Sequence, residues 1–181
     1  MRLLRVAGVE SGVRNLEFKA RLSDPNAMLA RARSIGAELW GDLRQTDTYF
    51  DVPRGRLKLR EAAGFQAELI YYERDEGAEH RESDYFVARF PEASPALDVL
   101  ARALGIRAVI RKRRTLVLLD TTRIHFDNVE GLGQFLEIEV PVKDDEGAAS
   151  ERLDSLIEGL GLSWRDCVRQ SYVDLLLEKS A

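Results

Sequence analysis

The stretch NLEFKARL, residues 15–22, alternates polar and apolar residues. Successive side chains of a strand point to opposite faces, so this alternation predicts a strand with one apolar and one polar face. The polar face is unusual, because it carries an amide, a carboxylate and two cations in order: Asn15, Glu17, Lys19 and Arg21. A sheet built from such strands would carry its charges on one face. The pattern of the other strands indicates whether that face points to water or into an interior.

Charged residues alternate with apolar ones in four further segments, which are RLKLR (56–60), AELIYYER (67–74), TRIHFDN (122–128) and FLEIEV (135–140). Taken one at a time, each segment fits a strand whose charged face lies in water. Taken together, carboxylates and cations gather in separate clusters. If the sheet closes into a barrel, every polar face points into one lumen, and the apolar faces point outward to covering helices.

Charges inside such a lumen need partners, because burying an unpaired charge is costly. Glu137 and Glu139 are two residues apart on one strand, so their carboxylates point the same way and suit Mg²⁺ or Mn²⁺. Lysines and arginines on facing strands suit a polyanion, and arginine binds phosphate through two parallel hydrogen bonds. The pattern indicates a metal and a phosphate chain, without the GxxxxGK[ST] loop of P-loop enzymes.

The remaining segments predict an α+β domain of about eight strands and four helices, with a largely antiparallel sheet. One helix is expected from a Ser23 or Asp24 cap to a stop at Gly36, and another from the expected cap Ser94 to a stop at Gly105. Two more are expected at 151–162 and 165–179. The other strands are expected at 46–62, around a turn at 53–55, and at 83–90 and 108–120.

The composition excludes several classes of protein. The net charge of −4 does not favour a general nucleic-acid role, and RKRR (111–114) falls inside an expected strand. One cysteine, Cys167, cannot form an internal disulfide. No apolar run approaches the roughly 20 residues of a membrane span, and Arg5 interrupts any signal-like start. We therefore expect a cytoplasmic protein with no membrane or nucleic-acid partner.

The ordered motifs resemble the CYTH superfamily, the triphosphate tunnel metalloenzymes. NLEFKARL resembles that family's ExExK signature, and the likeness continues through YFDVPRGRLKLRE (49–61), AELIYYERDE (67–76), RKRR and TRIHFDNVEGLGQFLEIEV (122–140), with SYVDLLL (171–177) near the end. Bacterial class IV adenylyl cyclases are the most similar group, and thiamine or inorganic triphosphatases also belong. The resemblance implies a closed eight-stranded antiparallel β-barrel with short helices outside. Residues 1–181 would then be one domain, with core motifs in 14–142, C-terminal helices in 146–179 and a possible homodimer.

The resemblance also implies a set of site residues. Glu17, Glu137 and Glu139 would hold divalent metal, with Asp127 nearby, and Lys19, Lys58, Arg60, Lys112 and Arg114 would grip the triphosphate as catalytic residues. Further substrate-binding candidates are Arg21, Tyr72, Arg74 and Arg113. The choice of Lys112 and Arg114 over Arg111 and Arg113 for the lumen rests on strand parity, and a slip of one residue reverses it. Asn15 replaces the first glutamate of ExExK, so it offers an amide oxygen to metal but no charge.

The expected function is that of a Mg²⁺- or Mn²⁺-dependent enzyme acting on ATP, thiamine triphosphate or tripolyphosphate. It would either cyclise ATP to cyclic AMP and pyrophosphate or hydrolyse a triphosphate. Two alternatives stay open. A polyphosphate or nucleotide sensor without turnover would explain Asn15, and a structural domain with a charged surface would bind no triphosphate. His125 alternates with Asp127 and shares its expected face.

Overall fold

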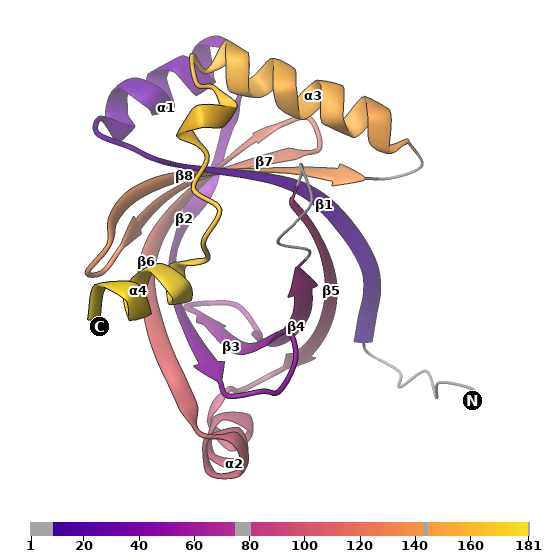
Figure 1. The fold of residues 1–181 in the computed structure, drawn as a ribbon, viewed down its shortest axis with the longest axis vertical. Helices are drawn as coiled ribbons and strands as arrows, with labels where there is room; N and C mark the ends of the chain where they lie inside the picture. The colour runs from indigo at the N-terminus through magenta and orange to yellow at the C-terminus, as the bar shows by residue number, and fades with distance from the viewer. Residues whose placement is uncertain (1–8, 75–80, 143–144, 181) are drawn as a thin grey trace.

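The structure is a computed structural model that describes residues 9–74, 81–142 and 145–180 (Figure 1). Its strands are β1 (Val9–Arg21), β2 (Glu38–Phe50), β3 (Arg56–Ala62), β4 (Ala67–Arg74), β5 (Arg81–Phe90), β6 (Ile106–Leu119), β7 (Thr122–Val129) and β8 (Gly133–Val142). Its helices are α1 (Pro25–Ser34), α2 (Ser94–Leu104), α3 (Glu146–Gly159) and α4 (Tyr172–Ser180), with a short 3₁₀ helix, η1 (Trp164–Asp166). The expected α+β class, with eight strands and four α-helices in the described residues, is confirmed.

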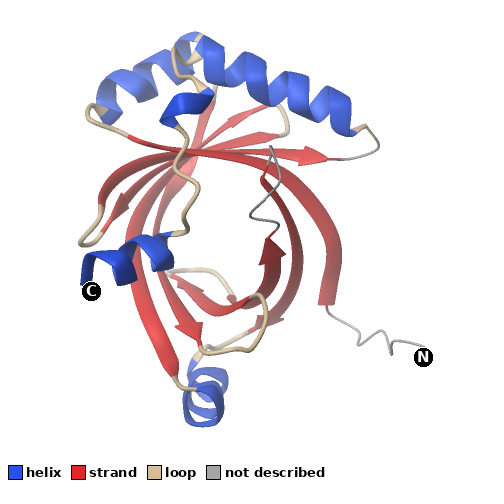
Figure 2. Cartoon of the chain, viewed as in Figure 1, coloured by secondary structure: helices blue, strands red, loops and turns tan. Residues whose placement is uncertain are grey.

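The strands form one curled antiparallel sheet, which Figure 2 shows in red with the helices in blue around it. Their order is β1-β5-β4-β3-β2-β6-β7-β8, and β8 pairs in turn with β1. Each strand therefore has an antiparallel neighbour on both sides. Curling gives the sheet an inner and an outer face, so the period-two alternation decides which side chains meet inside.

The outer face carries most of the apolar core. Leu16, Phe18 and Ile138 are fully buried and pack with Leu153 and Leu160 of the α3 region. Elsewhere on the same outer face, α2 covers a second cluster that contains Phe50 and Leu59. Burying these apolar side chains supplies the main driving force for folding, at roughly 1.5–3 kcal/mol for each large side chain. The polar residues between them are thereby directed to the inner face.

The helix α4 packs against the inner side of the sheet. Its residues Tyr172 and Val173 join Tyr49, Ile110 and Phe135 in a separate buried cluster. The rings of Phe135 and Tyr172 meet edge to face with centroids 5.0 Å apart. This end of the inner space is therefore filled by apolar and aromatic side chains.

The first two helices begin and end through specific backbone contacts. Asp24 caps α1, because its side chain accepts a hydrogen bond of 2.9 Å from the Ala27 amide. The expected Ser94 cap is wrong, since Ala93 holds the cap position and Ser94 is the first residue of α2. Gly105 ends α2 as expected, with a φ of 80° that favours glycine. The expected stop of α1 at Gly36 is also confirmed, since α1 ends at Ser34 with Ile35 as its cap and β2 begins at Glu38.

The expected helix over 165–179 is wrong in its first half. Residues after η1 run along β1 instead, where the Val168 amide donates to the Lys19 carbonyl at 2.7 Å. Cys167 forms an isolated bridge with Ala20 and packs half-buried against the outer core, so it does not lie on a helix. The sequence has helical spacing here, but pairing with the end of β1 satisfies the same backbone groups, and α4 begins only at Tyr172.

Candidate functional site

A cavity of about 440 Å³ lies inside the curled sheet, and all eight strands contribute to its wall. Residues of one parity line it on each strand, because alternate side chains point inward. Its ionisable lining residues are Glu17, Lys19, Asp47, Lys58, Arg60, Glu68, Arg89, Lys112, Arg114, Arg123, His125, Glu137 and Glu139. The inner face therefore concentrates charge that the apolar outer face excludes.

Asp47 gathers three cations from neighbouring strands. Arg60 donates to both carboxylate oxygens, at 2.7 Å and 2.8 Å, and Lys58 donates to Oδ2 at 3.0 Å. Lys112 lies 3.9 Å from the same oxygen. Burial alone would raise the pKa of Asp47, but the charges of Arg60, Lys58 and Lys112 outweigh it and hold that pKa well below its usual range. Asp47 is therefore an ionised anchor that fixes the cations in place.

The pKa of Lys58, beside this anchor, is lowered as well, and in a lysine this shift favours the neutral form. Burial, reinforced by the neighbouring charge of Arg60, lowers the pKa of Lys58 from its ordinary 10.5 to about 7, although Asp47 opposes the shift. Burial and the nearby Arg114 also lower the pKa of Lys112. These lysines have more positive charge nearby than one carboxylate compensates, so a bound anion would stabilise their charged forms.

A second charged network surrounds Arg114. Its guanidinium donates to Asp127 at 2.7 Å and 2.5 Å, and to Glu137 at 2.6 Å. Lys19 lies 3.1 Å from the other oxygen of Glu137. Tyr172 of α4 donates its hydroxyl to Asp127 at 3.0 Å, and burial beside Glu137 and Asp127 raises the pKa of that phenol well above its usual value. The C-terminal helix is thus tied directly to the charged interior.

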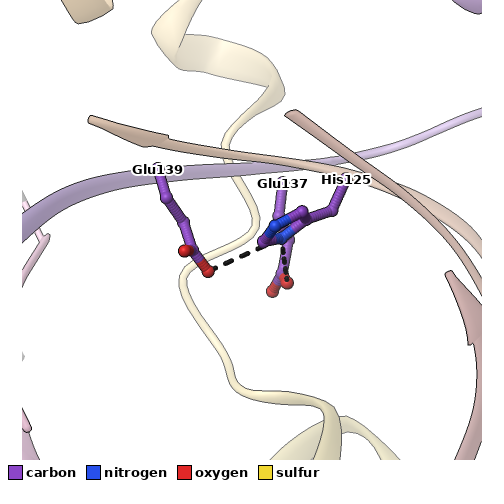
Figure 3. A group of neighbouring side chains, drawn as sticks. All are labelled: His125, Glu137 and Glu139. Atoms are coloured by element: carbon purple, nitrogen blue, oxygen red, sulfur yellow. Dashed lines mark ion pairs between the residues drawn. The ribbon is translucent and has the colours of Figure 1, made fainter. Parts of the chain in front are cut away.

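His125, Glu137 and Glu139 form a compact group of potential metal ligands, with one atom from each within 4.8 Å of the others (Figure 3). The His125 Nδ1 atom lies 3.5 Å from Glu139 and 3.9 Å from Glu137. Burial disfavours the charged carboxylate of Glu139, but His125 and Arg123 lower its pKa to about 2. Glu17 stands directly opposite Glu139 in the β1–β8 ladder. Three carboxylates therefore meet on two adjacent strands.

Two buried atoms in this region fit the requirements of a divalent cation. Asn15 Oδ1 and His125 Nδ1 have no hydrogen-bond partner in the described part of the chain. Both residues line the cavity with the carboxylates. Carboxylate and amide oxygens are hard ligands suited to Mg²⁺ and Mn²⁺, and imidazole also binds first-row transition metals. The residues present therefore fit a divalent metal ion.

The structure brings most of the expected site residues together. Ten of them line the cavity: Asn15, Glu17, Lys19, Lys58, Arg60, Tyr72, Lys112, Arg114, Glu137 and Glu139. The parity assignment at RKRR holds, because Lys112 and Arg114 are buried while Arg111 and Arg113 are exposed. Their roles toward metal and substrate stay predictions.

Three expected site residues lie away from the cavity wall. Arg113 lies on the outer face and is exposed, so it does not line the cavity although it was a substrate-binding candidate. Arg21 is exposed at the end of β1, where it donates to the Leu132 carbonyl and covers the Phe135 ring. Asp127 lies behind the cavity wall, with its oxygens taken by Arg114 and Tyr172. The side chain of Arg74 lies outside the described residues.

Asp47 is the main site residue that sequence reasoning missed. Gln45, Asp47 and Tyr49 alternate along β2 and all line the cavity. The expected strand over 46–62 included Asp47 and Tyr49, so the period-two test that identified β1 could have found Asp47. A strand of the observed length, from Glu38, would have added Gln45 to the same polar face.

Comparisons with known proteins agree with this arrangement. The family model for the CYTH domain matches residues 14–172. The adenylate cyclase CyaB of Aeromonas hydrophila is 28% identical over 172 residues, covering 87% of this chain and 85% of that protein. A conserved hypothetical protein of Pyrococcus furiosus has a solved structure with a TM-score of 0.76 and 26% identity, covering 89% of this chain and 99% of that one.

A more distant solved structure has the same fold. It is a Hippeastrum protein reported to have a dominant triphosphatase activity, with a TM-score of 0.66 and 13% identity, covering 91% of this chain and 96% of that one. At this identity the likeness concerns the fold alone. Among the described helices, none combines the length and apolar character needed to cross a bilayer.

Proposed function

Because the chain belongs to the CYTH family, whose model covers residues 14–172, we propose that it is a divalent-metal-dependent enzyme that acts on a triphosphate. The curled sheet would serve as a tunnel that holds the phosphate chain among the inward-facing cations. The name of the Aeromonas relative, an adenylate cyclase, supports a reaction on a nucleoside triphosphate.

One observation carries the proposal: three cations, Lys58, Arg60 and Lys112, gather around the buried carboxylate of Asp47. Lys112 also lies 3.6 Å from Asp127, but that carboxylate already pairs with Arg114. One carboxylate compensates one of these charges, so a polyanion is the natural partner for the remainder. Arginine and lysine donors are well suited to phosphate oxygens. A structural ion-pair network would instead balance its charges within itself.

The divalent ion would be held by Glu137 and Glu139. Glu17, Asn15 and His125 line the same cavity and could supply further ligands. When bound, that ion supplies positive charge that offsets the charge developing on the phosphate oxygens. Arg60 and Arg114 would orient the phosphate chain, because Asp47 and Asp127 each fix one guanidinium by two hydrogen bonds. Lys58 and Lys112 would add charge beside the leaving group.

Two reactions use this same clamp. In cyclisation, the ribose 3′-hydroxyl attacks the α-phosphorus, loses its proton, and pyrophosphate leaves as cyclic AMP forms. In hydrolysis, water attacks the terminal phosphorus and loses its proton, the diphosphate part of the substrate leaves, and orthophosphate is released. We propose that ATP, thiamine triphosphate and tripolyphosphate each be incubated with the protein and Mg²⁺ or Mn²⁺, and the products separated. Cyclic AMP with pyrophosphate would identify a cyclase, and orthophosphate would identify a triphosphatase.

A sensor that binds a triphosphate without turnover is the second candidate, and Asn15 is the observation that favours it. A neutral amide stands where the family signature has a carboxylate, so the chain offers one less negative ligand to metal. The same incubation separates the two candidates. Saturable binding of a triphosphate with no product from any of the three would support the sensor and contradict the enzyme.

A further inference from the structure

Gln45 lies on β2 with its side chain buried in the wall of the cavity. Its Oε1 atom is buried and has no hydrogen-bond partner in the described part of the chain. Buried amide oxygens are nearly always hydrogen-bonded, because desolvating an acceptor without a partner is unfavourable. The position therefore calls for a hydrogen-bond donor from a ligand in the cavity.

The surroundings of Gln45 combine this amide with apolar surface and cations. Gln45 stands directly opposite Lys112 in the β2–β6 ladder. Leu43, two residues earlier on the same face, stands opposite Arg114. Leu116 follows Arg114 on the same face of β6, and both leucines line the cavity. The unpartnered amide thus stands beside Lys112, and the apolar strip leads from it past Arg114 to Leu116.

A phosphate chain alone would form no favourable contact with Gln45 Oε1, Leu43 or Leu116. Its ionised oxygens accept hydrogen bonds and donate none, so they cannot satisfy Gln45 Oε1. Contact with leucine side chains would remove water from the phosphate oxygens without replacing the lost hydrogen bonds. A ligand that fills this wall must carry apolar surface and a hydroxyl or amino donor close to its phosphates. The cavity of about 440 Å³ lies in the range of about 300–1,000 Å³ that is typical for organic ligands.

We propose that Gln45, Leu43 and Leu116 form a subsite for the organic part of a triphosphate ester, a group that bears hydroxyl or amino donors, such as a nucleoside. The subsite rests on the proposed function, since Lys112 and Arg114 must bind the phosphates that place this group. It makes Gln45 a specificity residue: its amide accepts a hydrogen bond from an organic triphosphate and from no part of inorganic triphosphate.

The test compares dissociation constants of ATP, thiamine triphosphate and tripolyphosphate by isothermal titration with Mn²⁺ present. The variants are Gln45→Leu, which keeps the bulk and removes the amide, and Gln45→Asn, which keeps the amide and shortens it. Arg44→Gln is the matched control, because Arg44 is the exposed neighbour on the outer face of the same strand. Thermal unfolding of each variant confirms that it is folded.

The proposal predicts that Gln45→Leu lowers the affinity for ATP or thiamine triphosphate, relative to tripolyphosphate, by about tenfold, the effect of one lost hydrogen bond. Gln45→Asn should give a smaller change of the same sign, and Arg44→Gln none. An equal loss for all three ligands, or no loss for any, would overturn the subsite. If wild-type protein binds tripolyphosphate and neither organic triphosphate, the subsite fails while the proposed function stands. If wild-type protein binds none of the three, the proposed function itself fails and the subsite with it.

Discussion

Arg60 and Asp47 form a buried two-point ion pair, with Nε 2.7 Å from Oδ1 and Nη2 2.8 Å from Oδ2. The pair joins adjacent strands β2 and β3, where the two residues stand directly opposite each other. Because Asp47 also accepts from Lys58, one carboxylate fixes the positions of several cations before any anion arrives. Preorganised charge of this kind is what tight and oriented phosphate binding requires.

Replacing Asp47 with asparagine should destabilise the free protein and make it more dependent on an anion. We expect the free energy of unfolding to fall by about 3 kcal/mol, because the variant leaves three cations without their shared carboxylate. Tripolyphosphate should then raise the denaturation midpoint of the variant more than that of the wild type, as measured in urea titrations. Asp98→Asn, at an exposed position on α2, is the control. A variant as stable as the wild type would show that Asp47 is not the anchor.

The lowered pKa of Lys58 should make both stability and anion binding depend on pH. With a folded pKa of about 7 against an ordinary 10.5, Lys58 is neutral in the folded protein above pH 7 and still charged in the unfolded chain. Stability therefore rises with pH through this window, because the unfolded state holds the extra proton. A bound polyanion needs charged Lys58, so its binding should take up a proton, and its affinity should fall between about pH 7 and about pH 9.

Isothermal titration of tripolyphosphate in buffers of different ionisation enthalpy measures that proton uptake. Lys58→Arg is the matched variant, since arginine stays charged throughout the range. Its affinity should fall less with pH than that of the wild type, and its apparent enthalpy should depend less on the buffer. The same buffer dependence in wild type and variant would place the titrating group elsewhere.

Arg113 and Arg114 give a direct test of which side of β6 faces the ligand. Arg114 is buried with two carboxylate partners, and Arg113 is exposed on the outer face. We expect Arg114→Lys to lower turnover of a triphosphate about tenfold, because lysine cannot reproduce the paired hydrogen bonds of the guanidinium. Arg113→Lys should stay within about twofold of wild type. Equal effects in steady-state kinetics would contradict the inward assignment of Arg114.

Asn15→Glu should strengthen metal binding, because it adds a carboxylate to a wall that already holds Glu17 and faces Glu139. The affinity for Mn²⁺ should rise by about tenfold, and the variant without metal should be less stable, since like charges repel. Titration calorimetry and thermal unfolding with and without Mn²⁺ measure both effects. Asn15→Gln matches the size of glutamate without its charge. If this glutamine variant gained as much affinity, charge would not be the cause.

The period-two pattern predicted the inner face well, because alternation is a local property that the sheet preserves. It placed Glu17 and Lys19 of β1 on the same inner face as Lys58 of β3, although β1 and β3 do not pair with each other. It also chose Lys112 and Arg114 correctly, since the apolar neighbours of RKRR fix the register of β6. Side-chain direction could therefore be predicted wherever a strand was recognised at its full length.

What the sequence could not supply depends on contacts between distant segments. Residues 165–171 have helical spacing, yet Val168 bonds to Lys19 and Cys167 pairs with Ala20. Asp127 shares the inward parity of His125, but Arg114 and Tyr172 occupy its oxygens and remove it from the cavity wall. A local sequence pattern cannot show which of several inward-facing carboxylates will accept hydrogen bonds from an arginine or tyrosine that is distant in sequence.

Triphosphate turnover with and without divalent metal decides whether this cavity is a metal-dependent triphosphate site. Wild-type protein, Glu137→Gln and the control Asp98→Asn are incubated with ATP, thiamine triphosphate and tripolyphosphate, with Mg²⁺, with Mn²⁺ or with a chelator, and product is measured over time. Wild type and Asp98→Asn should convert at least one substrate only when metal is present. Glu137→Gln should be slower by about 100-fold or more, because it loses a carboxylate ligand. Equal turnover by Glu137→Gln, or no metal-dependent turnover by folded wild-type protein, would contradict the claim that this cavity is a metal-dependent triphosphate site.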